Sequence, residues 1–191
     1  MKFFAVAPAS IEGRTAKFRE YNNYAVRAMN RWVWSMLVVA TQAVSAPAPA
    51  PPAIEGVVTR VFDGDTVLVV VPSGDSVTVR LNGVDAPEIC QPHGVEARRA
   101  LEEMVLNQPV VAQPRGHDDH GRTLAKLLRG STDVGDRLVR DGHAWSYRYR
   151  DDKGPYVAQE RMAYALYRGL HATRQAVSPR EFRRLHGRCS T

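Results

Sequence analysis

Three Val- and Thr-rich runs lie close together between residues 54 and 81, and only short turn sequences separate them. Clusters of Gly, Pro, Ser and Asp between such runs are typical of hairpin turns, so we predict three successive strands at residues 55–62, 66–71 and 76–81. The Pro-Ser-Gly-Asp-Ser sequence at 72–76 would turn the second strand into the third. In the third run Val77, Val79 and Leu81 alternate with polar residues, which indicates one buried face.

The rest of the chain mixes helical patterns with short strands. We predict a helix over 97–107, strands at 110–113 and 124–129, a helix that is capped by Thr132 or Asp133 and reaches Gly142, and a last helix after Pro155. In this last helix an apolar stripe is expected to lie in the core, and it comprises Ala158, Met162, Ala165 and Leu166. Five short strands indicate an α+β domain with a small, partly closed barrel, such as an oligonucleotide-binding fold (OB-fold), and about three helices alongside.

The residues before this domain resemble an export signal. Residues 29–46 have a cationic start, a short apolar stretch and a small-residue end, which is typical of a secretory signal peptide. An uncleaved anchor or a buried helix remains the alternative. Residues 1–28 stay unassigned, and our hypothesis is that translation begins at Met29. The Pro- and Ala-rich residues 47–53 would form an extended linker.

Net charge alone does not identify a partner. The chain carries a formal charge of +6, but from Ile54 onward 20 Lys and Arg stand against 18 Asp and Glu. The expected domain, residues 54–175, is therefore nearly balanced, and its charge does not establish nucleic-acid binding. Residues 176–191 form a basic tail, which would be either a phosphate-attracting arm or an ordinary exposed end.

The chain has two cysteines, Cys90 and Cys189. In an exported protein two cysteines favour one disulfide, and this one would hold the basic tail beside the segment that follows Glu88. Two unpaired thiols are the alternative.

Acidic residues interrupt the first hairpin at "VFDGDTVLVV", residues 61–70. A turn explains Asp63 and the glycine after it. If the next turn falls at 72–76, paired positions sum to 148–150, and Asp65 lies opposite Asp85. Two carboxylates brought together need a cation, a shared proton or solvent between them. Main-chain carbonyls and water at the strand ends would favour Ca²⁺, which prefers oxygen ligands.

Other charged residues extend this cluster towards phosphate chemistry. Glu88 follows Asp85 by three residues, Arg80 lies on the outward face of the third strand, and Arg122 follows a glycine turn. Two permanently charged guanidinium groups beside carboxylates are suited to stabilising a phosphoryl group. Each arginine alone would be interpreted as a surface cation, but the combination favours a site.

These pieces resemble the thermonuclease, or staphylococcal-nuclease-like, family. The resemblance covers residues 54 to 171, and it rests on the order and spacing of "DGDT" (63–66), "RLNGVDAPE" (80–88), "HGR" (120–122) and "LVRDGHAWSYRY" (138–149). It implies a five-stranded OB-fold barrel with three helices, and Ca²⁺-dependent hydrolysis of phosphodiester bonds in DNA and RNA, leaving 3′-phosphate products.

The resemblance also implies roles for individual residues. Asp65, Asp85 and the main-chain carbonyl of Ala86 would bind Ca²⁺, with Asp63 supporting them without touching the ion. The catalytic set would be Arg80, Glu88 and Arg122. Glu88 would accept a proton from the attacking water, and the two arginines would stabilise the pentacoordinate phosphorus.

Two departures from the family pattern concern substrate binding. His120 stands where the family often has tyrosine, and Tyr147 and Tyr149 match its substrate-binding tyrosines only if one residue is deleted after Gly142. With Trp145, these tyrosines would either stack on bases or pack around a helix end. The loop from His117 to His120 would be a solvated loop that positions Arg122 rather than a second metal site.

We therefore predict an exported Ca²⁺-dependent nuclease with little sequence specificity, acting on DNA and RNA as a monomer. No stable protein partner is implied, and no membrane contact beyond a signal anchor. The alternatives are a non-catalytic OB-fold module that holds single-stranded nucleic acid, which would not need the full set of charged residues, and a structural domain without metal dependence.

Overall fold

The structure is a computed structural model that describes residues 51–149, 151–173, 175–187 and 189. The predictions for residues 1–28, for residues 29–46 and for the start of the 47–53 linker lie outside these described residues. In this part of the chain no helix combines the length and apolar character needed to cross a membrane. The strands are β1 Ile54–Val61, β2 Thr66–Val70, β3 Ser76–Leu81, β4 Val84–Asp85, β5 Pro109–His117, β6 Thr123–Arg129, β7 Thr132–Asp133 and β8 Trp145–Ser146. The helices are α1 Gly94–Val105, α2 Val134–Arg140, α3 Val157–Ala165, the 3-10 helix η1 Gly169–His171 and α4 Pro179–His186.

Five strands form a closed barrel, as the sequence predicts. Their order is β3-β2-β1-β5-β6, all neighbours are antiparallel, and a parallel pairing of β3 with β6 closes the ring. In the closing pair Val79 lies opposite Thr123 and Arg80 opposite Leu124. The end of β3 is therefore fixed beside the start of β6, although more than 40 residues separate them.

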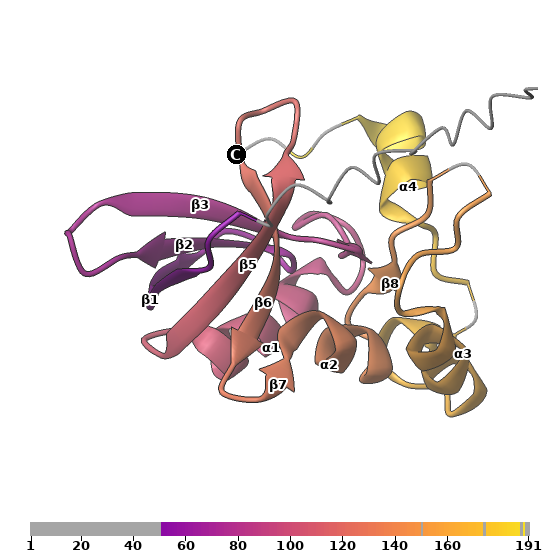
Figure 1. The fold of residues 1–191 in the computed structure, drawn as a ribbon. Helices are drawn as coiled ribbons and strands as arrows, with labels where there is room; N and C mark the ends of the chain where they lie inside the picture. Colours follow the sequence, from indigo (N-terminus) through magenta and orange to yellow (C-terminus); the bar gives the residue numbers. More distant parts are fainter. Residues whose placement is uncertain (1–50, 150, 174, 188, 190–191) are drawn as a thin grey trace, which may run out of the picture. The chain divides into compact units, whose positions relative to one another are not determined.

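The barrel and two helices share one hydrophobic core. Figure 1 shows α1 and α2 running along one side of the strands. Val67, Val69 and Val79 from the strands are fully buried, and so are Leu101 of α1 and Leu138 of α2. The helix predicted over 97–107 is present as α1, although it begins at Gly94 and ends at Val105, and it buries Ala97, Leu101 and Val105.

Asp133 connects three elements beside the barrel. Its carboxylate caps α2 by accepting hydrogen bonds from the backbone N–H groups of Gly135 (3.0 Å) and Asp136 (3.2 Å). It also accepts from the Tyr156 hydroxyl just before α3 and pairs with Lys126 of β6 at 3.0 Å. The predicted cap at Thr132 or Asp133 is confirmed at Asp133.

The stripe predicted to be buried in the last helix is wrong. Among the residues of α3 only Ala163 is buried. Met162 is 49% exposed and Leu166, the residue after the helix, is 55% exposed, while Ala158 and Ala165 are also exposed. These residues do have helical spacing, but they face solvent. The helix contacts the core through Ala163 instead.

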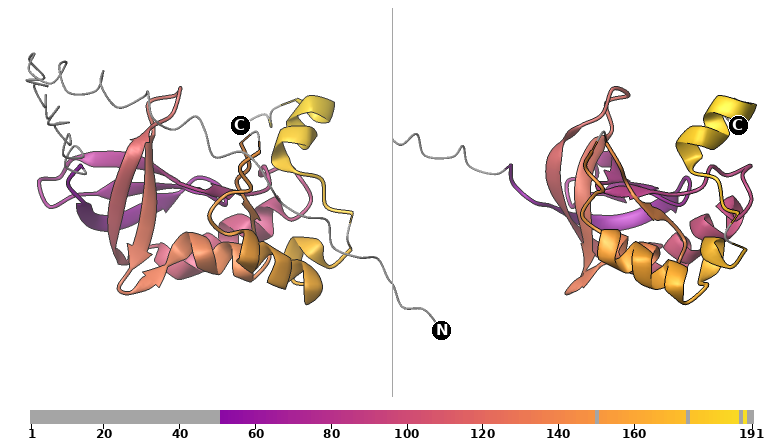
Figure 2. Two further views of the ribbon diagram at one scale, coloured as in Figure 1. Left: turned by 45° about the vertical axis from the view of Figure 1, so that its right-hand side comes forward. Right: turned by 90° about the vertical axis from the view of Figure 1, so that its right-hand side faces the viewer.

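The basic tail contains a helix, α4, which the sequence analysis did not predict. Ser178 caps α4 by accepting from the backbone N–H of Glu181 at 3.3 Å, and Pro179 occupies the first turn. Cys189 follows the helix and forms a disulfide with Cys90, with Cα atoms 5.7 Å apart. The predicted disulfide is therefore present, and it holds the tail beside the segment after Glu88. Both views in Figure 2 show α4 above the loop that precedes α1.

Candidate active site

Gly64 explains how two carboxylates fit at the end of β1. The Asp63 side chain accepts a hydrogen bond from the backbone N–H of Asp65 at 3.0 Å, which folds the chain tightly between the strands. A Cβ atom on Gly64 would lie 2.7 Å from the Cβ of Ala86 and 2.9 Å from that of Ala97. The glycine therefore lets the 86–88 segment and α1 pack directly against the loop. The turn at residues 63–65 therefore also forms part of the candidate site.

Asp65 is buried, and both of its carboxylate oxygens accept hydrogen bonds. It is 3% exposed, and one carboxylate oxygen accepts from Arg80 and from the Thr66 hydroxyl at 3.0 Å. The other oxygen accepts from the backbone N–H of Ala86 at 3.1 Å. A carboxylate with this many donors is held in one orientation, and Ala86 is brought against it.

Asp85 does not reach Asp65 by the predicted register, which is wrong. Thr66 lies opposite Arg80 and Val67 opposite Val79, so paired positions sum to 146, and the backbone of Leu81 pairs with Asp65. The turn is tighter than predicted because Val71 and Asp75 already pair across it. Asp85 arrives instead on β4, which follows a turn at Gly83 and pairs with β8, Asp85 lying opposite Trp145.

Arg80 nevertheless brings the two carboxylates to one place. Its guanidinium pairs with Asp65 through Nη1, and its Nη2 lies 3.6 Å from Asp85 Oδ1. Both carboxylates therefore point towards the same positive charge.

The site carries more negative charge than Arg80 alone neutralises. Burial and the Asp65 carboxylate raise the pKa of Asp63 to about 7. Burial and Asp65 also raise the pKa of Asp85 to about 6, although Arg80 and Arg183 act in the opposite direction. A further cation at this position would relieve the repulsion that these shifts reflect.

The donors present fit a calcium ion. Among the described residues no group of three or more His, Cys, Asp or Glu side chains is placed to hold a metal. Asp65 and Asp85 would therefore need main-chain carbonyl and water oxygens beside them, and calcium sites commonly use such ligands. Ala86 lies beside these carboxylates, because its backbone N–H donates to Asp65 at 3.1 Å.

Arg122 reaches the same cluster from the loop between β5 and β6. Asp118 Oδ2 accepts from its Nε at 2.7 Å, and Asp118 Oδ1 accepts from its backbone N–H at 2.9 Å. Arg122 Nη1 lies 3.4 Å from the Thr66 hydroxyl, which in turn contacts Asp65. Burial alone would raise the pKa of Asp118, but hydrogen bonds from Arg122 lower it below its usual value. The loop thus positions Arg122, as predicted.

Glu88 has a partner that the sequence interpretation missed. Its carboxylate pairs with Arg183 of α4, and its backbone N–H donates to the Gln91 side chain at 3.2 Å. Thr66 was also missed, although it lies within the "DGDT" motif and links Asp65 to Arg122. Its place in the motif was a usable signal, whereas nothing in the spacing of residues 88 and 183 indicates their contact.

The aromatic residues divide into exposed and buried ones. Tyr147 is 44% exposed and Tyr149 60% exposed, and the backbone N–H of Tyr147 donates to Gly83, two residues before Asp85. Trp145 is buried and packs edge-on against His171, so for Trp145 the packing alternative is correct. His120 is exposed, and its backbone N–H donates to Asp118.

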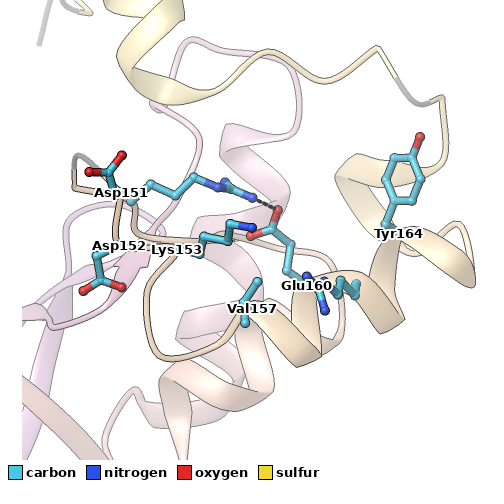
Figure 3. Close-up of a pocket in the computed structure, with 8 residues that line it drawn as sticks. Asp151, Asp152, Lys153, Val157, Glu160 and Tyr164 are labelled. Atoms are coloured by element: carbon cyan, nitrogen blue, oxygen red, sulfur yellow. Dashed lines mark hydrogen bonds and ion pairs between the residues drawn. The ribbon is translucent and has the colours of Figure 1, made fainter.

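A hollow of about 580 Å³ lies elsewhere in the described part of the chain. It is lined by Arg148, by residues 151–153 and by residues of α3. Figure 3 shows its charged lining, in which Glu160 forms an ion pair with Arg148. None of the predicted site residues, all of which are described, lines this hollow. The carboxylates and arginines instead gather near the end of β3.

Comparisons with known proteins show which family this chain belongs to. A family model described as "Staphylococcal nuclease homologue" matches residues 78–172. An uncharacterized endonuclease of Haemophilus influenzae is 30% identical over 127 residues, covering 66% of this chain and 71% of its own. A micrococcal nuclease of Shigella flexneri is 32% identical, covering 74% and 86%, and Protein ParB of Escherichia coli is 33% identical, covering 82% and 95%. The chain therefore belongs to the staphylococcal nuclease family.

Proposed function

We propose that this protein is an exported, Ca²⁺-dependent nuclease that hydrolyses phosphodiester bonds of DNA and RNA with little sequence specificity. The observation that carries the proposal is the convergence of Asp65 and Asp85 on Arg80. Relatives that are named as nucleases support hydrolysis of nucleic acid.

The proposed chemistry divides between a base and two cations. Glu88, as a carboxylate, accepts a proton from the water that attacks phosphorus. Arg80 and Arg122 donate hydrogen bonds to the pentacoordinate phosphoryl group, whose negative charge exceeds that of the substrate. Thr66 links these two arginines through Asp65, so their relative position is fixed before substrate arrives.

Asp65, Asp85 and the Ala86 carbonyl are the proposed calcium ligands. When bound, the ion supplies positive charge that neutralises phosphate oxygens and completes the charge balance of the site. Asp63 supports this set by its hydrogen bond to the backbone of Asp65.

The proposed substrate surface extends from the site along β8. The β4–β8 pairing places Tyr147 next to the segment that carries Asp85. Exposed tyrosine rings can stack on bases of any sequence, which favours single-stranded DNA or RNA without sequence preference. His120, on the loop that carries Arg122, is the second proposed contact.

Cleavage of a single-stranded DNA oligonucleotide, with Ca²⁺ and with chelator, tests the proposal. We expect cleavage with Ca²⁺, none with chelator, and a rate about 10²- to 10⁴-fold lower for Glu88→Ser. Glu103→Ser is the matched control, because Glu103 is an exposed α1 residue paired with Arg99. Its cleavage rate should equal that of the unchanged protein.

The other outcomes separate the rival functions. Equal cleavage in every condition would contradict the catalytic set and the role of calcium. Binding of the oligonucleotide without cleavage in any condition would favour the non-catalytic binding module.

Export is a separate part of the proposal. The signal-like residues 29–46 support it. Sequencing the N-terminus of the mature protein should place the cut near Ala43 or Ala46, and a peptide from residues 2–28 in the cellular precursor would contradict a start at Met29.

A further inference from the structure

The C-terminal segment is anchored on the loop that carries Glu88. Cys189 forms the disulfide with Cys90, and its sulfur also accepts from the Cys90 backbone N–H at 3.1 Å. Gln91 is 6% exposed, and its side chain donates to the Val177 carbonyl at 2.6 Å and accepts from the Glu88 backbone. The residues on both sides of α4 are therefore bound to the same short segment, residues 88–91.

Little apolar packing holds α4 in place. Within the helix only Pro179 is buried, and Leu185 is 55% exposed. In Figure 2 the helix lies above the loop and apart from the barrel. Because the disulfide and the Gln91 contacts flank it, the helix is fixed at its two ends, and its middle is presented to the loop.

Arg183 stands in this middle and contacts the proposed base. Its Nη1 pairs with Glu88 Oε1, and the two side chains are only 37% and 26% exposed. Its charge also acts on Asp85, so it belongs to the electrostatic environment of the whole site. A guanidinium bound to one carboxylate oxygen orients the group and leaves the second oxygen able to accept a proton.

We propose that Arg183 is a positioning residue of the nuclease site: it holds the Glu88 carboxylate in place, and the Cys90–Cys189 disulfide holds Arg183. This inference rests on the proposed function, since it assigns Arg183 a task only if Glu88 serves as the base. The loop holds only the backbone of Glu88, through two hydrogen bonds with Gln91, whereas Arg183 contacts the carboxylate itself. Small displacements of a reacting group slow catalysis strongly, so a contact that fixes the Glu88 carboxylate would increase the cleavage rate.

Single-turnover cleavage of a single-stranded DNA oligonucleotide with Ca²⁺, using the full chain, tests the proposal. Arg183→Gln should lower the rate roughly 10- to 100-fold. Arg184→Gln is the matched control: it removes the same charge from the same helix, but Arg184 is 70% exposed and pairs only weakly with Glu181 of α4, at 3.4 Å. Its rate should stay within about twofold of the unchanged protein, the scatter expected for exposed surface changes.

Two further measurements separate positioning from general attraction of phosphate. Affinity for the same oligonucleotide in chelator, from fluorescence anisotropy, should change equally little in both variants. Arg183→Lys, which keeps the charge but loses the planar fork, should cleave at an intermediate rate.

The disulfide offers a second route to the same effect without changing Arg183. The double variant Cys90→Ser, Cys189→Ser should lose rate in the same direction as Arg183→Gln. Combining all three changes should add little further loss, because the disulfide is proposed to act through Arg183.

Unchanged or faster cleavage by Arg183→Gln would overturn the inference, and faster cleavage would mean that Arg183 masks Glu88. A loss shared by Arg184→Gln, or matched by an equal loss of affinity, would also overturn it. If the unchanged protein cleaves nothing, the proposed function itself fails. If it cleaves and only the Arg183 effect is absent, the proposed function stands.

Discussion

At the scale of single residues, negative charge is concentrated where the barrel strands end. Asp65 and Asp85 share the Arg80 guanidinium, and the pKa values of Asp63 and Asp85 are raised to about 7 and about 6. In the unfolded chain both would lie near their usual value of 3.8. Folding therefore makes these carboxyl groups bind protons more tightly.

This linkage predicts a pH dependence for the metal-free protein. Raised carboxyl pKa values favour the folded state below pH 4, and that contribution is lost as pH rises through about 6 and about 7. The free energy of unfolding in chelator should therefore fall between pH 4 and 7, by at most about 1.4 kcal/mol per pH unit for each proton. Urea unfolding at a series of pH values would measure it.

Asp63→Asn should flatten this slope near pH 7, because it removes the group with the higher pKa. Added Ca²⁺ should stabilise the protein more at pH 8 than at pH 5, since protons and the ion compete for the carboxylates. A slope that is unchanged in Asp63→Asn would contradict the assignment.

Gly64→Ala provides a steric test at the same scale. The new methyl group would lie under 3 Å from the Cβ atoms of Ala86 and Ala97, neither of which can move aside as a flexible side chain would. We expect a loss of about 1–3 kcal/mol in unfolding free energy, as for other overpacked positions. Gly74→Ala is a useful comparison, because no atom lies within 4 Å of its added Cβ, although its φ of 91° adds local strain.

At the scale of elements, Asp133 joins β6, α2 and α3 through one carboxylate. Asp133→Ala should remove the cap of α2 and leave the hydroxyl of the buried Tyr156 without this acceptor, costing about 2 kcal/mol or more. Urea unfolding would show it, and Asp133→Asn should lose less because the amide oxygen can still cap the helix. Equal stability of Asp133→Ala and the unchanged protein would contradict the role.

Local patterns predicted the five barrel strands and the site motifs, but not the short strands β4, β7 and β8. They failed where a contact with a residue distant in sequence determines the structure. The first hairpin was found, but a tighter turn shifted its register, so Asp85 needed β4 and β8 to reach Asp65. The stripe of Met162 and Leu166 has helical spacing, but spacing does not reveal whether another element covers a face.

The helix α4 shows a signal that was present and unused. Ser178, Pro179 and Glu181 form a recognisable helix start, with a capping serine, proline in the first turn and an acid three residues on. What no local pattern contains is the contact between Arg183 and Glu88, because it depends on a disulfide that spans 99 residues.

At the scale of the whole molecule, the barrel closes within the described residues. All residues proposed for catalysis, calcium and substrate lie between Asp63 and Tyr149, and Arg183 adds one contact from α4. A chain that begins at Pro51 therefore contains every element of the proposed site.

Deleting residues 1–50 should leave the midpoint of thermal unfolding and the cleavage rate unchanged within error. Circular dichroism and the oligonucleotide assay would measure the two quantities. The full chain is the control, and a large loss of either quantity would show that the N-terminal residues take part in the domain or its site.

The parallel pairing of β3 with β6 determines when during folding the site forms. Arg80 and Arg122 come together only when this long-range pairing completes the ring. If the proposed export takes place before the chain folds, the protein cannot cut the DNA of the producing cell during transit. Its capacity to cut would arise only after it has refolded on the far side.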